Sequence, residues 1–521
     1  MLSSIETLFP DDKTYQGGKN MSLNVRDYNN KDRLLFPAAI GDYIPHEHLA
    51  WFIDDVVEQL NLDCLYTKIP SVGNPSYHPK MMLKILFYGY AASAFSSRKI
   101  AKALETDVAF IFLSGMQKPD FRTISDFRKN NVEELPGLFV QIVRLCKKLG
   151  LVGLGHISID STVIKASANR DRTYDRERCI LEEQAIEKKI KELLDSAQAI
   201  DEKEDELFGP HQRGDELPKE LRSRQRRLEK IKEAKKKLEE ESLKEVNLTD
   251  HDATFQREKG KVFRPGYRAE AVMDEKEQII VACDVINKAN DEEELLPSIE
   301  QTVNNLPEIT SQDSRVIVTA DSGYSAMEAL KKLEEEKPYL DAYIPDVRYQ
   351  AKQDGKTIDE DSPFHKKHFS YNPDKDVYIC PNQKELTYRR ANIDTAGRRY
   401  SVYACDHCQG CSYFGACTKC PRGRAISVYD NREQIYEMRR KLDSADGKRI
   451  YSKRKIIVEP PFGNIKHNLR FREFLLRGLK KVKAEFALIA IIHNILKIAR
   501  FLRRRLFFKL PREDLIPLSV I

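Results

Sequence analysis

Between residues 45 and 150, hydrophobic residues recur every three or four positions. This spacing runs through four stretches, PHEHLAWFIDDVVEQL, PKMMLKILFYGYAASAF, SSRKIAKALETDVAFIFLSG and TISDFRKNNVEELPGLFVQIVRLCKKLG. A period of about 3.6 residues is typical of helices that bury one face, so this part of the chain is predicted to be all-helical. Ser96 or Ser97, and Thr123, are candidate N-caps, because a hydroxyl oxygen can accept from a free N–H group of the first turn.

The pattern changes at residue 156, where hydrophobic and polar residues begin to alternate. GHISID and TVIKAS are predicted strands, and YRAEAVMDEKEQIIVACDVIN (267–287) is a predicted hairpin that turns at DEKE. Beyond it, DEEELLPSIEQTVNNL and SAMEALKKLEEEK are predicted helices, and SRVIVTAD (314–321) and LDAYIP (340–345) are predicted strands. Antiparallel strands followed by alternating helices and strands indicate an α/β core.

Two segments interrupt this core. Residues 175–246 are highly charged and carry two hydrophobic stripes separated by FGPHQRGDELP, which predicts a helical hairpin or short coiled coil. We expect a mechanical or dimerising arm there rather than a catalytic element. Residues 350–435 hold a cluster of cysteines. The predicted domains are therefore a helical N-terminal domain (1–150), a first part of the core (151–174 and 247–349), the hairpin insertion (175–246), the Cys-rich insertion (350–435) and the rest of the core with basic C-terminal helices (436–521).

Composition narrows the class of protein. The chain has 521 residues, of which 41% are hydrophobic and 32% charged, and it holds no apolar run long enough to span a membrane. The first residues, MLSSIETLFPDDK, lack the basic and apolar regions of a secretion signal. We therefore expect a cytoplasmic protein without a membrane partner, in which the ten cysteines do not form a disulfide framework.

The charge is unevenly distributed. The net charge of the whole chain is +6. Residues 451–521 hold 17 Lys and Arg against 5 Asp and Glu, a net charge of +12, so the rest of the chain carries −6. Such a basic segment suits a polyanion such as nucleic acid, although a solvated basic surface would look the same. The short helices of the N-terminal region also carry basic residues near their starts, which suits a DNA-binding module of the helix-turn-helix kind. The candidate DNA contacts there are Arg98, Lys99, Arg122 and Arg128.

Three carboxylates stand at the ends of predicted elements. Asp160 ends the first predicted strand, Asp321 ends SRVIVTAD, and Glu459 precedes Pro460 and Pro461 at what reads as a helix start. Each alone suits a turn or a helix N-terminus. The carboxyl ends of neighbouring strands converge in an α/β sheet, however, and several carboxylates there suit Mg²⁺, or Mn²⁺, in phosphoryl transfer by two metal ions. Lys466 follows Glu459 by seven residues, about two turns, on roughly the same helix face.

The clustered cysteines have the spacing of metal ligands. They form C-x2-C-x2-C followed by C-x2-C, with one more upstream, as Cys380, Cys405, Cys408, Cys411, Cys417 and Cys420. Such thiolates suit a structural Zn²⁺, which would let a loop-rich segment fold without a large core. An iron–sulfur cluster or unmetallated thiols are the alternatives. With His407 the set exceeds one four-ligand site, so the ligands cannot be assigned from spacing.

These motifs together resemble the DDE transposases of bacterial insertion sequences, and more narrowly the long subgroup with a helical N-terminal domain and a Cys-rich insertion. The resemblance covers most of residues 40–500 and implies a ribonuclease-H-like α/β core in which Asp160, Asp321 and Glu459 bind two Mg²⁺ or Mn²⁺ ions. The matching text includes YHPKMMLKILFYGY, FSSRKIAKALE, PDFRTISDFRK, GHISIDSTVIKA, NLTDHDA, GYRAEAVMDEKEQIIVACDVINKANDEEEL, ADSGY, VEPPFGNIKHN and LIAIIHNILKI.

One signature of this superfamily, Tyr-x2-Arg-x3-Glu-x6-Lys, is matched only in part. Glu459 and Lys466 keep the last spacing, but Tyr451 and Arg454 lie one residue too far from Glu459, while Lys455 is at the expected distance. Arg454, Lys455 and Lys466 are nevertheless predicted to position the DNA backbone. His251 in TDHDA stands where relatives usually carry Pro, and we expect that loop to be structural.

The resemblance implies a transposase that acts on double-stranded DNA in the bacterial nucleoid. It would bind the inverted-repeat ends of its own element, cut there with a metal-activated water, and join the freed 3′-hydroxyl to target DNA. Because two ends must meet, we expect a homodimer. The alternatives are a ribonuclease-H-like DNA nuclease without strand transfer and a DNA-binding protein that has lost catalysis.

Overall fold

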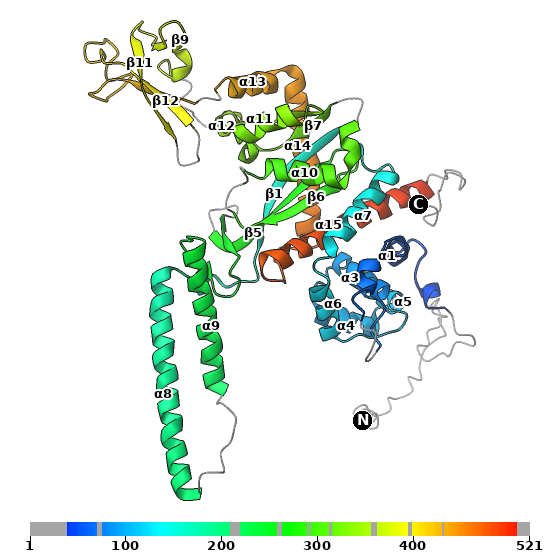
Figure 1. The fold of residues 1–521 in the computed structure, drawn as a ribbon. Coiled ribbons are helices and arrows are strands. Elements are labelled where there is room, and N and C mark those ends of the chain that lie inside the picture. The colour runs from blue at the N-terminus through cyan, green and yellow to red at the C-terminus, as the bar shows by residue number, and fades with distance from the viewer. Residues whose placement is uncertain are drawn as a thin grey trace, which may run out of the picture. The chain divides into compact units, whose positions relative to one another are not determined.

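The structure is a computed structural model that describes residues 39–507 apart from 70–74, 209–218, 258–262, 289–290, 292, 312–314, 356–361, 394–398 and 430–431. The chain divides into two compact units, Met1–Tyr43 and Ile44–Ile521. Of the first unit, only a short 3-10 turn (Ile40–Tyr43) and the residue before it are described. All elements below belong to the second unit, and Figure 1 labels most of them.

The N-terminal part of this unit is helical, as the hydrophobic spacing predicts. Thr123 is not the N-cap of its helix: Asp120 takes that role, and its Oδ1 accepts a hydrogen bond of 2.7 Å from the Thr123 N–H. The domain boundaries predicted from the sequence stay predictions. The helices are α1 (Leu49–Glu58), α2 (Asp63–Tyr66), α3 (Pro79–Ala91), α4 (Ser97–Thr106), α5 (Val108–Leu113), α6 (Phe121–Asn130) and α7 (Leu135–Lys148).

A mixed sheet forms the centre of the molecule. Its strands are β1 (His156–Lys165), β4 (Thr254–Arg257), β5 (Phe263–Asp274), β6 (Ile280–Ile286), β7 (Val316–Thr319) and β8 (Leu340–Tyr343). The order is β4-β5-β1-β7-β8, and β6 also pairs with β5. The first strands pair antiparallel, whereas β1–β7 and β7–β8 are parallel. The predicted hairpin at 267–287 and the alternating helices and strands after it are thus confirmed.

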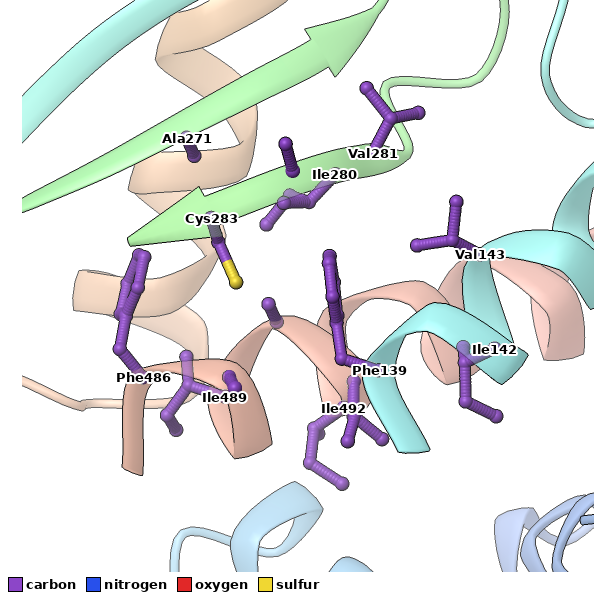
Figure 2. Packing of buried hydrophobic residues seen from close by; sticks show 14 of the residues in the cluster. Phe139, Ile142, Val143, Ala271, Ile280, Val281, Cys283, Phe486, Ile489 and Ile492 are labelled. Carbon is purple, nitrogen blue, oxygen red and sulfur yellow. The ribbon is translucent and has the colours of Figure 1, made fainter. Parts of the chain in front are cut away.

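Helices cover this sheet and bury its hydrophobic side chains. They are α10 (Leu295–Asn305), α11 (Met327–Glu336), α14 (Ala445–Gly463) and α15 (Leu479–Phe507), with 3-10 turns at Pro307–Ser311 and Ser322–Tyr324. In Figure 2, Phe139 of α7 and Phe486 of α15 point toward the β5–β6 hairpin, and Cys283 points from β6 toward these helices. Asn494 of α15 also mimics a strand partner, because its side-chain amide both donates to and accepts from the Ile280 backbone.

A pair of long helices lies between β1 and β4 in the chain (Figure 1). These are α8 (Arg176–Phe208) and α9 (Lys219–Glu240), and the predicted separator at 208–218 falls almost wholly outside the described residues. The strands β2 (Thr173–Tyr174) and β3 (Val246–Asn247) pair at the base of the two helices, next to a 3-10 turn at Arg170–Arg172. Buried Ile186, Ile231 and Leu238 join the helices into a small hydrophobic core.

The cysteine-bearing segment folds around a second, antiparallel sheet with the order β13-β12-β11-β10-β9. Its core includes Tyr378, Leu386 and Tyr403. None of the described helices is both long and apolar enough to cross a membrane. The remaining elements are α12 (Val347–Gln353), a 3-10 turn at Lys366–His368, β9 (Ser370–Asn372), β10 (Val377–Ile379), β11 (Glu385–Ile393), β12 (Arg399–Ala404), β13 (Ala425–Tyr429), α13 (Arg432–Asp443) and a π-helical turn at Asn464–Asn468.

Candidate active site

The register of two parallel strands brings Asp160 and Asp321 to the same level of the sheet. Ser158 of β1 pairs with Thr319 of β7, and each aspartate follows its paired residue by two positions. The sequence prediction that Asp160 ends its strand is wrong, because β1 continues to Lys165 along β5. The neighbouring strand β7 ends at Thr319, close to the level of Asp160. Beyond that level β1 continues beside β5 but no longer beside β7. Asp321 begins a 3-10 turn and accepts a 2.8 Å hydrogen bond from the Gly323 N–H.

Asp160 sits in a partly desolvated setting beside a cation. Burial raises the pKa of its carboxyl to about 6, the Arg454 guanidinium opposes that rise, and the charge of Asp321 adds to it. Arg454 Nη1 lies 3.5 Å from Asp160 Oδ2, and both side chains are largely buried, with exposed fractions of 12% and 21%. The Ser161 N–H donates to Asp160 Oδ1 at 2.9 Å. Asp160 is therefore mostly ionised at neutral pH and takes up a proton on mild acidification.

A second pair of carboxylates, Asp291 and Glu270, lies behind these aspartates. Asp291 Oδ2 accepts from Ser161 Oγ at 2.9 Å and pairs with Arg268 Nη1 at 2.7 Å. Glu270 faces Ser161 across the β1–β5 ladder and is almost fully buried. Burial, followed by the charge of Asp291, raises the pKa of Glu270 to about 9, so Glu270 holds its proton at neutral pH. Sequence reasoning missed both residues, although NKANDEEEL contains Asp291.

Tyr324 lies near both carboxylate pairs. It lies in the ADSGY motif and is fully buried. Burial raises the pKa of its phenol well above the ordinary value, and the charges of the four surrounding carboxylates raise it further, in the order Glu270, Asp291, Asp160 and Asp321. The neutral hydroxyl is therefore buried near four carboxyl groups, and it has no hydrogen-bond partner among the residues that the structure describes. This residue was not singled out from the sequence either.

Glu459 does not begin a helix, as its two following prolines suggested; it lies inside α14 and near its end. Proline lacks an N–H, so Pro460 leaves the carbonyl of Ile456 without its helical donor. Gln278, in the β5–β6 turn, supplies that donor, because its Nε2 donates to the Ile456 carbonyl at 2.9 Å. The helix therefore continues through the prolines and passes into the π-helical turn that carries Lys466.

The inner face of α14 contacts the strand that carries Asp160. Arg454 lies against Asp160, and Lys466 Nζ donates to the Val163 carbonyl of β1 at 2.8 Å. Tyr451 also faces the aspartates: its hydroxyl donates to Gln350 Oε1 at 3.1 Å, and its pKa is raised to about 12, mainly by burial. Arg454 thus takes the place by Asp160 despite its irregular spacing, while Lys455 is exposed. Glu459 lies between the two contacts, exposed and without an ion pair or hydrogen bond to any residue that the structure describes.

The three predicted metal ligands are not drawn together. Across the described residues, no three Asp, Glu, His or Cys side chains converge as a set that could hold a metal ion. The donor chemistry nevertheless suits Mg²⁺, which takes one or two carboxylates and keeps several waters. Asp160 and Asp321 provide two carboxylates on adjacent strands, and Glu459 has free oxygens on the helix beside them.

The cysteines gather around one small cavity. Cys380, Cys405, Cys408, Cys411 and Cys417 line it, whereas Cys420 is exposed and does not. Three sulfur atoms accept hydrogen bonds, Cys380 Sγ from the Lys384 N–H at 3.3 Å, Cys408 Sγ from the Arg424 N–H at 3.3 Å and Cys411 Sγ from Asn382 Nδ2 at 3.2 Å. Such donors stabilise thiolates. As stated above, these thiols do not form a metal-ligand set in the described structure.

The four predicted DNA contacts of the N-terminal helices differ in exposure. Arg98, Lys99 and Arg122 are exposed, and the Arg98 and Arg122 guanidinium groups lie 5.1 and 5.7 Å from the ring centre of the partly exposed Phe121. Arg128 is buried instead, and its Nη1 donates to the Tyr90 hydroxyl at 2.8 Å. Tyr90 donates in turn to Glu485 of α15 at 3.1 Å. Arg128 therefore connects the N-terminal helices to the core.

Fold and site together define a class, an α/β core with paired aspartates on adjacent strands and a helical N-terminal region. Two family models match the chain: residues 379–499 match the Transposase DDE domain, and residues 38–130 match the Transposase domain (DUF772). These matches indicate a DDE-type insertion-sequence transposase, which confirms the resemblance seen in the sequence. A DDE domain implies a ribonuclease-H-like core. The first match contains Glu459 and Lys466, while Asp160 and Asp321 lie outside both matches. No curated protein matches the chain.

Proposed function

We propose that this protein binds the terminal inverted repeats of its own insertion sequence and catalyses Mg²⁺-dependent cleavage and strand transfer at those ends. The observation that carries the proposal is the register of β1 and β7, which sets Asp160 beside Asp321. Glu459 lies between Arg454 and Lys466 in the sequence, and both of these residues contact β1. The transposase family matches support the reaction class.

Different side chains are assigned different roles in phosphoryl transfer. Asp160, Asp321 and Glu459 would hold Mg²⁺, which when bound neutralises phosphate charge and lowers the pKa of a coordinated water. Arg454 Nη1 lies 3.5 Å from Asp160 Oδ2, and its Nε is buried without a hydrogen-bond partner in the described structure, so this guanidinium is assigned to a phosphate oxygen of DNA bound at the aspartates. Lys466 fixes α14 on β1 through the Val163 carbonyl. Tyr324 holds a proton among the carboxylates.

DNA recognition is assigned to the exposed basic surface of α4 and α6. Arg98 and Arg122 flank Phe121, so two cations and an aromatic ring form one patch, and Lys99 lies beside it. Guanidinium groups pair with phosphates, and an exposed ring can stack on bases. Arg128 is left out of this surface because it is buried. A homodimer would present two such patches, one for each end of the element.

A structural Zn²⁺ is proposed for the Cys-rich sheet, with its ligands among the five cysteines that line the common cavity. Hydrogen bonds to three of their sulfur atoms favour thiolates, which are the form that binds zinc. Metal content measured on purified protein tests this. About one Zn²⁺ per chain, lost with Cys408→Ser but kept with the exposed Cys420→Ser, is the expected result. Iron with sulfide, or no metal, would contradict it.

The test of the main proposal is a cleavage and joining assay on labelled duplex DNA that carries the element's ends. Wild type is expected to cut the ends in Mg²⁺ and join them to a target. Asp160→Ala, Asp321→Ala and Glu459→Ala should still bind but neither cut nor join. Variants that cut as well as wild type would overturn the assignment of the site.

Two outcomes separate the alternative functions. End cleavage without joined products, at any target DNA concentration, would indicate a ribonuclease-H-like nuclease. Binding of the ends without cleavage in either Mg²⁺ or Mn²⁺ would indicate a catalytically silent DNA-binding protein.

A further inference from the structure

The hairpin helix α9 carries a concentration of positive charge that the proposed reaction does not use. From Arg222 to Lys237 it holds nine Lys and Arg against two Glu. Part of this charge is neutralised by α8: Arg227 pairs with Glu182, Lys235 with Glu183 and Lys232 with Glu187, each at 3.0 Å. These pairs hold the two helices together.

Three other cations of α9, Arg222, Arg226 and Lys230, line an open cleft of about 770 Å³ together with Arg227. Five of its eight lining residues are Lys or Arg, and none of the residues lining it is an Asp or Glu. The lining residues are Arg172, Tyr174, Arg222, Ser223, Arg226, Arg227, Lys230 and Leu248. A cleft of this size, lined mostly by cations and by no Asp or Glu, suits a polyanion rather than an apolar small molecule.

The geometry of α9 gives the cleft a regular edge. Arg222, Arg226 and Lys230 are each separated by four residues, so they form one stripe with a rise of about 6 Å between neighbours. None of the three forms an ion pair with any residue that the structure describes, and neither does Arg172 at the opposite side of the cleft. These cations therefore have free donors for an incoming anion.

The cleft is tied to the strand that carries Asp160. Arg172 follows the end of β1 by seven residues, and its carbonyl accepts from the Leu248 N–H at 2.9 Å. Lys237 of α9 pairs with Asp252, whose Oδ2 accepts from the Leu479 N–H of α15 at 2.7 Å. Neighbouring Arg477 donates through Nε to the Ser167 carbonyl at 2.9 Å, just past β1. Basic side chains thus continue from the end of β1 to the hairpin.

We infer that this cleft is a binding site for the phosphate backbone of duplex DNA, and that α8 and α9 guide DNA past the catalytic strand. The inference rests on the proposed function for the identity of the polyanion. It replaces the view of the hairpin as only a mechanical or dimerising arm. Arg is suited to this role because its planar fork can bind two phosphate oxygens at once.

The experiment measures equilibrium binding of the full-length protein to labelled element-end duplex, without divalent metal, over a range of salt concentrations. The test variant is Arg222→Ala/Arg226→Ala/Lys230→Ala. The control is Lys188→Ala/Lys189→Ala/Lys191→Ala, which removes the same charge from exposed positions of α8 in the same hairpin. A third variant, Arg222→Lys/Arg226→Lys/Lys230→Arg, keeps the charge.

Losing three phosphate contacts should reduce the slope of log K against log salt by about 2–3, and weaken binding on the order of 100-fold near physiological salt. The α8 control and the charge-keeping variant should stay close to wild type. An unchanged slope in the test variant, or an equal loss in the control, would overturn the inference. So would a change in oligomeric mass with unchanged binding, which would make the hairpin a protein–protein contact. The experiment measures DNA binding and not cleavage, so its result can be interpreted even if the catalytic proposal fails.

Discussion

The two halves of the candidate active site are positioned by different means. Asp160 and Asp321 stand on neighbouring strands, and backbone hydrogen bonds between those strands set their relative level. Glu459 stands on α14, which packs its buried Val458 and Phe462 into the core. Side-chain contacts from Arg454, Lys466 and Gln278 also hold this helix and the turn after it. A ladder of backbone bonds leaves little freedom, whereas side-chain contacts can rearrange. From this comparison we expect the strand half to be formed in the isolated chain and the helix half to complete the site.

The position of Arg454 supports this division. Its guanidinium lies by Asp160, so it balances part of the negative charge of the two aspartates. Repulsion between the aspartates is thereby reduced.

The largest effect is expected from Arg454→Ala. We expect cleavage to fall by roughly 10–100-fold, because a charge-assisted contact to phosphate and the counter-charge of Asp160 are both lost. The Arg454 cation lowers the pKa of Asp160 against the stronger effect of burial, so its removal should raise that pKa above about 6. The acid limb of the pH–rate profile should therefore move to higher pH.

Lys455→Ala is the matched control, since it removes one positive charge from the adjacent, exposed position. Its cleavage rate and pH profile should stay near those of wild type. If Lys455→Ala were the more damaging variant, the spacing expected from the superfamily signature would describe the site better than the observed geometry does.

Amide hydrogen exchange with and without Mg²⁺ tests the division directly. Amides of residues 451–468 should exchange roughly tenfold more slowly when Mg²⁺ is added, because ordering of the helix half removes local opening. Amides of β1 and β7 should change little, since their ladder is already formed. Equal protection of both halves, or none, would show that the helix is as fixed as the strands. Glu459→Gln should abolish the Mg²⁺ effect on the helix.

The sequence predicted the strand half better than the helix half, and the reason is physical. Alternating hydrophobic residues located β1 and β7 and placed Asp160 and Asp321 together, although β5 extends the pairing of β1 beyond Asp160 in a way that local pattern does not show. Glu459 was misplaced because its prolines read as a helix start. The donor that lets α14 run through them comes from Gln278, 178 positions away.

Asp291 and Glu270 were missed for a related reason. In the sequence Asp291 looks like one more member of the acidic run NDEEE, and Glu270 is one polar residue in a strand. Only the pairing of β1 with β5, and the Arg268 ion pair, show that both are buried beside the site. Long-range pairing of buried charges leaves no periodic signal.

Glu270→Gln sharpens the picture of the strand half. The pKa of Glu270 is raised to about 9 in the folded protein, so the folded state keeps a proton that the unfolded chain loses near its ordinary pKa of 4.5. The free energy of unfolding should therefore fall as pH rises from 4.5 to about 9, and Glu270→Gln should remove that fall. Between pH 6 and 9 we expect the variant to gain up to about 4 kcal/mol relative to wild type, measured by chemical denaturation. The exposed Glu300→Gln should show no such gain.

The smallest effect concerns the contact that carries α14 through its prolines. Gln278→Asn keeps a residue that tolerates the positive φ of 59° at this position, but its shorter amide cannot reach the Ile456 carbonyl. It should cost about 1 kcal/mol of stability. Pro460→Ala restores a backbone N–H that can donate to the Ile456 carbonyl. In the Pro460→Ala background, Gln278→Asn should therefore lower the free energy of unfolding by clearly less than it does in wild type. The coupling from this double-mutant cycle, measured by denaturation, should be about 0.5–1 kcal/mol. Additive effects would show that Gln278 does not replace the missing proline N–H, and that the helix half is held without it.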